Sequence, residues 1–128
     1  MDITLKMLED WGACGEEVEL FVRTFVEYGS PSVEITPDNI ERAVDAKLSL
    51  MWLAVRLPET GLMGALAYYT IYYQRQEALN SMFGEMCAGI ITQAEYWLKR
   101  NACYAKYDRV MRLAGAELLE WAYCGGVK

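Results

Sequence analysis

Apolar residues recur along most of the chain with the spacing of amphipathic helices. The helical stripes lie within residues 3–11, 18–25, 40–55, 62–73, 78–84, 90–100 and 107–121. Residues 32–35 alone alternate like a strand, and four residues are too few to build a sheet. The pattern therefore predicts an all-α fold: a compact bundle of five to seven helices that forms one domain over residues 1–128.

Helix boundary signals sharpen part of this picture. Thr36-Pro37 reads as an N-cap followed by proline in the first helical position. We expect the helix that it opens to continue through Val55, because one apolar face runs from Ile40 to that residue. Glycine and proline predict irregular chain over residues 29–37 and again over residues 58–61.

Charge is distributed unevenly along the chain. The net charge is −6, yet residues 1–41 hold ten acidic and two basic residues, whereas residues 99–112 hold five basic residues and one acidic residue. A solvated helix face is the usual explanation of such a basic run. Contact with DNA phosphates is a second explanation, and an acidic protein partner is a third.

The residue types present argue against catalysis. The chain contains no histidine, which removes the commonest general base and most zinc sites. It has no glycine-rich phosphate loop and no nucleophile elbow. Neighbouring carboxylates such as Glu16-Glu17 are typical of surface charge. We therefore expect no enzyme, no cofactor, no metal site and no small-molecule substrate.

The cysteines and the hydropathy bear on the compartment. The four cysteines are scattered without a C-x-x-C pair, and we expect buried or half-buried thiols at Cys14, Cys87, Cys103 and Cys124. No apolar run has the length of a membrane helix, and the first residues do not resemble a signal peptide. The expectation is a cytoplasmic protein with no membrane partner.

Aromatic residues are unusually dense in the second half of the chain. The cluster comprises Tyr68, Tyr69, Tyr72, Tyr73, Tyr96, Trp97, Tyr104 and Tyr107. Such residues can stack on bases or anchor an interface. Their helical spacing favours a third interpretation, that they form part of the core.

The basic run suggests a candidate helix-turn-helix within residues 75–123. A helix over residues 92–100, a short break at Asn101-Ala102-Cys103 and a basic helix from Tyr104 would give the required order. The candidate DNA-binding residues are Lys99, Arg100, Lys106, Arg109 and Arg112.

Three segments carry a resemblance to a known family. Leu8-Glu9-Asp10-Trp11-Gly12-Ala13 resembles an opening motif, Asp45-Ala46 precedes an apolar helix, and Leu62-x-x-x-Leu66-Ala67-Tyr68-Tyr69 resembles a helix that ends in a tyrosine pair. Together they are similar to the small, single-domain branch of the lambdoid phage antitermination protein Q. That family closes with a helix-turn-helix and an Ala-Glu pair.

Two registers fit the closing motif. In the first register, counted forward from Tyr68-Tyr69, the Ala-Glu pair of the motif is Ala94-Glu95. The recognition helix is then residues 90–98, which contain no basic residue before Lys99. Counting back from Ala116-Glu117 needs an insertion upstream and places Lys106, Arg109 and Arg112 on the recognition helix. We favour the second register, because neutralising phosphates requires cations.

The resemblance implies a specific function. Such proteins bind double-stranded DNA near a phage late promoter, load onto a paused bacterial RNA polymerase that still holds sigma, and suppress pausing and termination in the host cytoplasm. An alternative is an acidic phage protein that inhibits a host nucleic-acid machine, such as a CRISPR effector, as a DNA mimic or a protein-binding inhibitor. One continuous acidic face would favour mimicry, whereas a basic helix clear of the acids would favour DNA binding.

Overall fold

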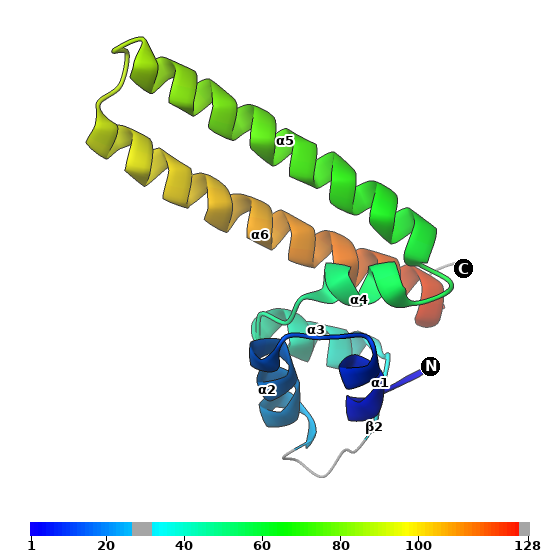
Figure 1. The fold of residues 1–128 in the computed structure, drawn as a ribbon. Helices are drawn as coiled ribbons and strands as arrows, with labels where there is room; N and C mark the ends of the chain where they lie inside the picture. The colour runs from blue at the N-terminus through cyan, green and yellow to red at the C-terminus, as the bar shows by residue number, and fades with distance from the viewer. Residues whose placement is uncertain (27–31, 126–128) are drawn as a thin grey trace.

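The computed structural model describes residues 1–26 and 32–125 and confirms the all-α prediction. The elements are β1 (Asp2–Thr4), α1 (Leu5–Asp10), α2 (Gly15–Thr24), β2 (Ser32–Glu34), α3 (Pro37–Asp45), α4 (Leu50–Arg56), α5 (Gly61–Cys87) and α6 (Gln93–Tyr123). The short elements from β1 to α4 form a rounded part that we call the head, and α5 and α6 form a long hairpin that we call the arm (Figure 1). The arm projects well beyond the head.

A small sheet closes the head. β1 pairs antiparallel with β2, with Ile3 opposite Val33, and both side chains are buried. The strand predicted within residues 32–35 is confirmed as β2, but the expectation that it is too short to build a sheet is wrong, since it forms a two-stranded sheet with β1. The helix expected from Ile3 begins at Leu5 instead, because the Thr4 hydroxyl accepts a hydrogen bond from the Met7 amide at 3.2 Å and caps it there.

The Trp-Gly-Ala segment that carries the family resemblance ends α1. Gly12 has a φ of +78°, and its amide donates to the Glu9 carbonyl while the Ala13 amide donates to the Leu8 carbonyl. This is a Schellman cap, which requires a left-handed residue after the helix. Trp11 packs on Trp52 of α4, with ring centroids 6.5 Å apart. The motif thus has a structural role in the head.

The helix predicted over residues 37–55 is in fact two helices, α3 and α4. The Thr36 cap is confirmed, since its hydroxyl accepts from the Asn39 amide at 3.2 Å. The chain reverses at Lys47, whose φ is +63°, and the Ser49 amide then donates to Glu17 Oε2 of α2 at 3.1 Å. The apolar spacing concealed the break, because both helices turn their apolar faces toward the same core.

Helix α4 joins the head to the arm. Ala54 of α4, Leu57 directly after α4 and Leu119 of α6 are almost fully buried. A Cβ built on Gly115 of α6 would lie 2.3 Å from the Met51 amide nitrogen, so only glycine fits where α4 crosses α6. The buried Thr60 hydroxyl donates to the Ala54 carbonyl at 2.6 Å and fixes the turn into α5.

The arm is an antiparallel hairpin of two continuous helices. Residues 88–92 form the turn, and Thr92 and Glu95 form a capping box that starts α6. The break predicted at Asn101-Ala102-Cys103 is wrong, since all three lie inside α6. None of these residue types stops a helix that packing supports, and Cys103 is buried. Residues 75–123 therefore place two helices side by side (Figure 1), whereas helices cross at a wide angle in a helix-turn-helix.

Candidate nucleic-acid interface

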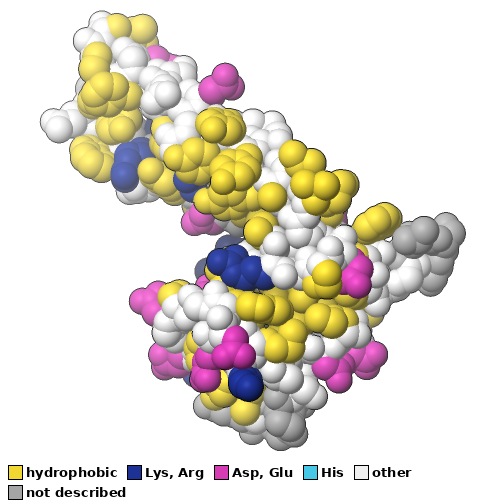
Figure 2. Space-filling view, turned by 45° about the vertical axis from the view of Figure 1, so that its right-hand side comes forward, with side chains coloured by type: hydrophobic (Ala, Val, Ile, Leu, Met, Phe, Trp, Pro, Cys, Tyr) yellow, Lys and Arg dark blue, Asp and Glu magenta, His cyan; other side chains and the backbone are white. Residues whose placement is uncertain are grey.

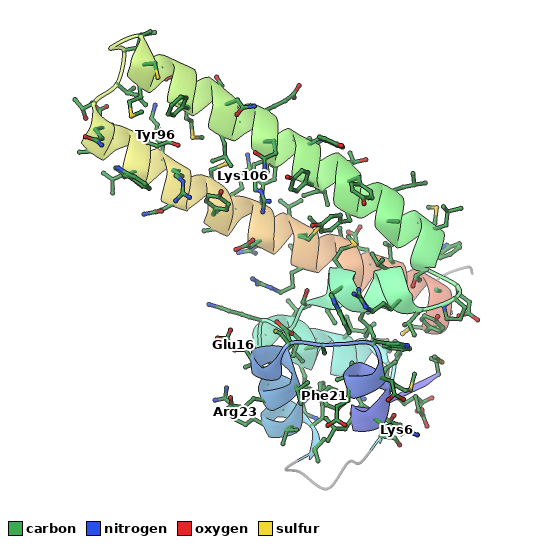
Figure 3. The ribbon with its side chains drawn as sticks, in the orientation of Figure 1. Lys6, Glu16, Phe21, Arg23, Tyr96 and Lys106 are labelled. Carbon is green, nitrogen blue, oxygen red and sulfur yellow. The ribbon has the colours of Figure 1, made fainter. Side chains whose placement is uncertain are left out.

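Three of the five predicted DNA-binding residues share one side of α6, and two of them, Lys99 and Lys106, lie at the exposed outer rim of a groove between α6 and α5. Lys99, Lys106 and Arg109 lie within about 80° of one another on the helix, at 100° per residue, and all three are exposed. Figure 3 shows Lys106 midway along the arm, whereas Glu16 lies on the head. We call these three residues the outer basic band.

The band contains few competing contacts. Lys99 Nζ lies 3.9 Å from Glu85 Oε2, and both side chains are partly exposed. Lys106 Nζ sits 5.4 Å from the centroid of the neighbouring Tyr107 ring. Neither Lys106 nor Arg109 forms an ion pair with another residue in the described ranges 1–26 and 32–125. An exposed ion pair contributes little, so Lys99 can exchange the Glu85 carboxylate for a phosphate.

Arg100 does not belong to this surface. Its guanidinium lies between Trp97 and Tyr104, at 5.1 and 4.8 Å from the ring centroids. Arg75 of α5 lies over the same Tyr104 and over Tyr72, 5.2 Å from each centroid. The contact between Arg75 and Tyr104 joins α5 to α6, and a cation–π contact of this kind stabilises the hairpin.

Arg112 is not part of the outer basic band either. It lines a cleft of about 250 Å³ between α6 and the head, together with Lys47, Glu17 and Asp108. The two cations and two carboxylates balance one another formally. Arg112 therefore belongs to the junction of head and arm, and the five predicted residues divide among three environments.

The aromatic cluster is not core, and that interpretation is wrong. None of its eight residues is buried: Tyr68, Tyr69, Tyr73 and Trp97 are exposed and the other four are half-buried. Most rings of the cluster stack edge-on or face-on with neighbours, as Tyr68 does with Tyr72 at 6.2 Å. The available signal was the near absence of charge from α5, which left that helix without a polar face.

The charges separate between the two parts of the molecule. Residues 1–60 hold twelve acidic and five basic residues, a net of −7, whereas residues 61–125 hold six of each. Figure 2 shows acidic side chains at several separate places on the head, with apolar and uncharged atoms between them. On that face the acids do not form one continuous patch.

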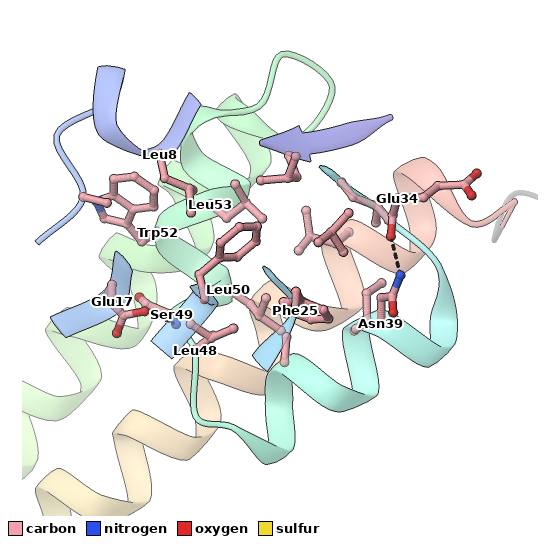
Figure 4. A pocket seen from close by; sticks show the side chains of 18 residues that line it. Leu8, Glu17, Phe25, Glu34, Asn39, Leu48, Ser49, Leu50, Trp52 and Leu53 are labelled. Carbon is pink, nitrogen blue, oxygen red and sulfur yellow. Dashed lines mark hydrogen bonds between the residues drawn. The ribbon is translucent and has the colours of Figure 1, made fainter. Parts of the chain in front are cut away.

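A cavity of about 80 Å³ lies inside the head (Figure 4). Its lining is mainly apolar and includes Phe21, Ile40 and Leu50. The polar groups at its rim are satisfied within the chain, since Asn39 Nδ2 donates to the Glu34 carbonyl at 2.9 Å. The mainly apolar lining is that of a packing gap in the core.

The remaining titratable groups have structural environments. Cys103 is buried and Cys124 half-buried, as predicted, whereas Cys14 and Cys87 are exposed, which corrects the expectation for those two. Burial, reinforced by the hydrogen bond that Tyr123 donates to Glu59, raises the pKa of Tyr123 to about 12. Burial also raises the pKa of the Cys124 thiol. In the described ranges no three His, Cys, Asp or Glu residues gather as metal ligands.

Two further findings concern the described chain as a whole. Across residues 1–26 and 32–125, no helix has both the length and the hydropathy needed to cross a membrane. Comparison with protein-family models, with curated proteins and with solved structures finds no match to this chain.

Proposed function

We propose that this protein is a non-catalytic transcription antitermination factor that binds double-stranded DNA near a promoter and acts on bacterial RNA polymerase. One observation carries the proposal: the outer basic band of α6 stands on the arm, clear of the acidic head. That arrangement is the one expected of a DNA-binding helix on an acidic protein, and it adds to the resemblance carried by residues 8–13.

The band suits phosphate contact by a continuous helix. From Lys99 to Arg109 is ten residues, or about 15 Å along the helix axis. Double-stranded DNA carries one negative charge per roughly 1.7 Å of its axis, so three cations over that length can each meet a phosphate. Basic helices without a turn bind the major groove in several known architectures. The proposal therefore does not depend on a helix-turn-helix.

The head carries the opposite charge to the outer basic band. Its net charge of −7 over residues 1–60 disfavours DNA and suits a basic protein surface. The nucleic-acid channels of an RNA polymerase are lined by such surfaces, because they hold phosphates. We therefore assign DNA contact to the arm and polymerase contact to the head.

Run-through transcription tests this function. The DNA element is first selected from a random duplex library with the purified protein and placed at a promoter upstream of an intrinsic terminator. With purified bacterial RNA polymerase, the wild-type protein should increase read-through. Arg109→Ala should reduce that increase severalfold, whereas Arg112→Ala, the same change one turn away in the cleft, should retain it. No increase with the wild-type protein contradicts the proposal.

The acidic head also favours a second candidate, an inhibitor that mimics DNA. Its distinguishing property is competition: the mimic would displace DNA from a host nuclease or effector complex and would not itself bind duplex DNA. The separated acids in Figure 2 and the outer basic band both weigh against it. Absence of duplex binding together with displacement of DNA from such a complex would favour the mimic over the antitermination factor.

A further inference from the structure

Helix α5 carries a second, mostly apolar stripe that the described chain leaves largely exposed, although the ring of its last member, Phe83, contacts Tyr96 of α6 with centroids 5.9 Å apart. Its members recur at alternating steps of four and three residues, and they are Leu62, Leu66, Tyr69, Tyr73, Gln76, Asn80 and Phe83. This is the heptad spacing of a coiled-coil seam. We call these seven residues the outer seam.

The outer seam lies on the side of α5 that faces away from α6. Arg75 and Met82 of α5 meet α6, Gly64 packs on α4 and Ile71 is buried, and each of these four residues follows a seam residue by two positions. Two residues correspond to about 200° around a helix, which is nearly the opposite side. Figure 3 shows side chains projecting from α5 on this side, beyond the hairpin.

The seam residues are strongly exposed for their type. The five large apolar members retain between 52% and 76% of their accessible surface. Of the fourteen exposed large hydrophobic residues in the described part of the chain, all except Met1 lie within residues 62–121. A contiguous exposed patch of this kind marks an interaction site.

We propose that the outer seam is the interface of a homodimer, in which α5 packs in parallel on α5 of a second copy. The charge pattern supports a second copy as the occupant. Residues 61–74 contain no charged residue, and none of the seven seam residues is charged. An uncharged seam of heptad pitch is best matched by an uncharged seam of the same pitch, and a second copy supplies one by symmetry.

The polar seam residues select the parallel arrangement. In a parallel pair, Gln76 meets Gln76 and Asn80 meets Asn80 of the second copy, and each amide can both donate and accept. An antiparallel pair centred on Tyr73 would instead set Asn80 against Leu66 and leave the amide unsatisfied. A polar residue in the seam is a known means of fixing the register of a coiled coil.

The available area is sufficient for a dimer. Large side chains carry about 200 Å² each, so the five apolar seam residues expose on the order of 600 Å² per copy. Two copies would cover about 1,200 Å², above the roughly 1,000 Å² that a specific interface needs. The head contacts α5 through α4, which packs at Gly64, two positions after a seam residue and so nearly opposite the seam; the second copy therefore meets no obstruction at that contact.

Molar mass in solution tests the dimer, which does not depend on the proposed function. Sedimentation or light scattering at micromolar concentration should give the wild-type protein twice the 14.6 kDa of one chain. Leu66→Lys should weaken association by about a hundredfold or more, since it opposes two like charges in the seam. Leu98→Lys is the matched control: it alters a leucine on α6 that is even more exposed than Leu66 and should leave the dimer intact.

Both leucines are exposed in the single chain, so circular dichroism should show the same helix content for the two variants. A wild-type protein with the mass of one chain overturns the proposal, and so does a Leu66→Lys variant that stays dimeric. Cys87 follows Phe83 by four residues on the same stripe and is exposed. In a Cys14→Ser background, mild oxidation should link Cys87 to Cys87 of the second copy, and a dimer that forms no such link overturns the parallel arrangement.

Discussion

Single residues that allow close backbone packing or a left-handed conformation determine where helices cross and where they end. Gly115 permits α4 to cross α6 at a separation that no side chain allows, and Gly64 leaves a Cβ only 3.1 Å from the Val55 amide nitrogen. Gly12 and Lys47 hold left-handed conformations that end α1 and α3. Close packing at the two helical glycines and chain reversal at the two left-handed residues thus help to place the helices relative to one another.

Replacement of Gly115 by alanine should therefore be costly. The added methyl group would collide with backbone atoms of Leu50 and Met51, and a forced shift of this kind costs about 1–3 kcal/mol. Gly84→Ala is the matched control on α5, because nothing lies within 4 Å of its Cβ and alanine favours the helix by up to about 1 kcal/mol. Urea denaturation should show opposite signs for the two variants, and equal stability of the two would refute the crossing at Gly115.

At the scale of elements, sequence periodicity predicted helices well and helix ends less well. Thr36-Pro37 identified the start of α3, because capping chemistry is local. Ile3 was misassigned, since its strand forms only by pairing with residues that lie thirty positions later. The division at Lys47 was missed because it depends on a left-handed non-glycine residue, which has no clear sequence signal.

Reasoning from neighbouring residues in the sequence was less successful for the candidate DNA-binding residues. It grouped the five cations because they are close in sequence, but the structure places them in different environments, some of which involve other elements. Arg100 meets Tyr104 and Trp97 on the side where Arg75 of α5 contacts the same Tyr104, and Arg112 meets the cleft beside Glu17. Which cations stay exposed depends on how α5, α6 and the head pack against one another, and this tertiary packing cannot be read from the local sequence.

The continuity of α6 has a direct experimental consequence. Backbone amides in the interior of a helix are protected from hydrogen exchange, whereas those of a turn are not. The amides of Asn101, Ala102 and Cys103 should therefore exchange at rates similar to those of Lys99 and Tyr104. Exchange of these three amides faster by orders of magnitude would restore the turn and the helix-turn-helix.

At the scale of the whole molecule, the chain divides its properties between two parts. The head contains most of the buried apolar residues and carries the net negative charge, since the acidic and basic residues of 61–125 balance. The arm carries the outer basic band on α6 and the outer seam on the far side of α5. Separate surfaces for DNA, for a basic partner and for a second copy are consistent with a protein that assembles a complex rather than one that performs a reaction.

The salt dependence of duplex DNA binding tests the outer basic band most directly. Affinity for a short labelled duplex is measured over a series of salt concentrations for the wild-type protein, Arg109→Ala and Arg112→Ala. Loss of one phosphate contact should lower the log–log slope by about 0.9 for Arg109→Ala and leave the slope of Arg112→Ala unchanged. Equal slopes for the wild-type protein and Arg109→Ala, or no duplex binding at all, would contradict DNA binding by this helix.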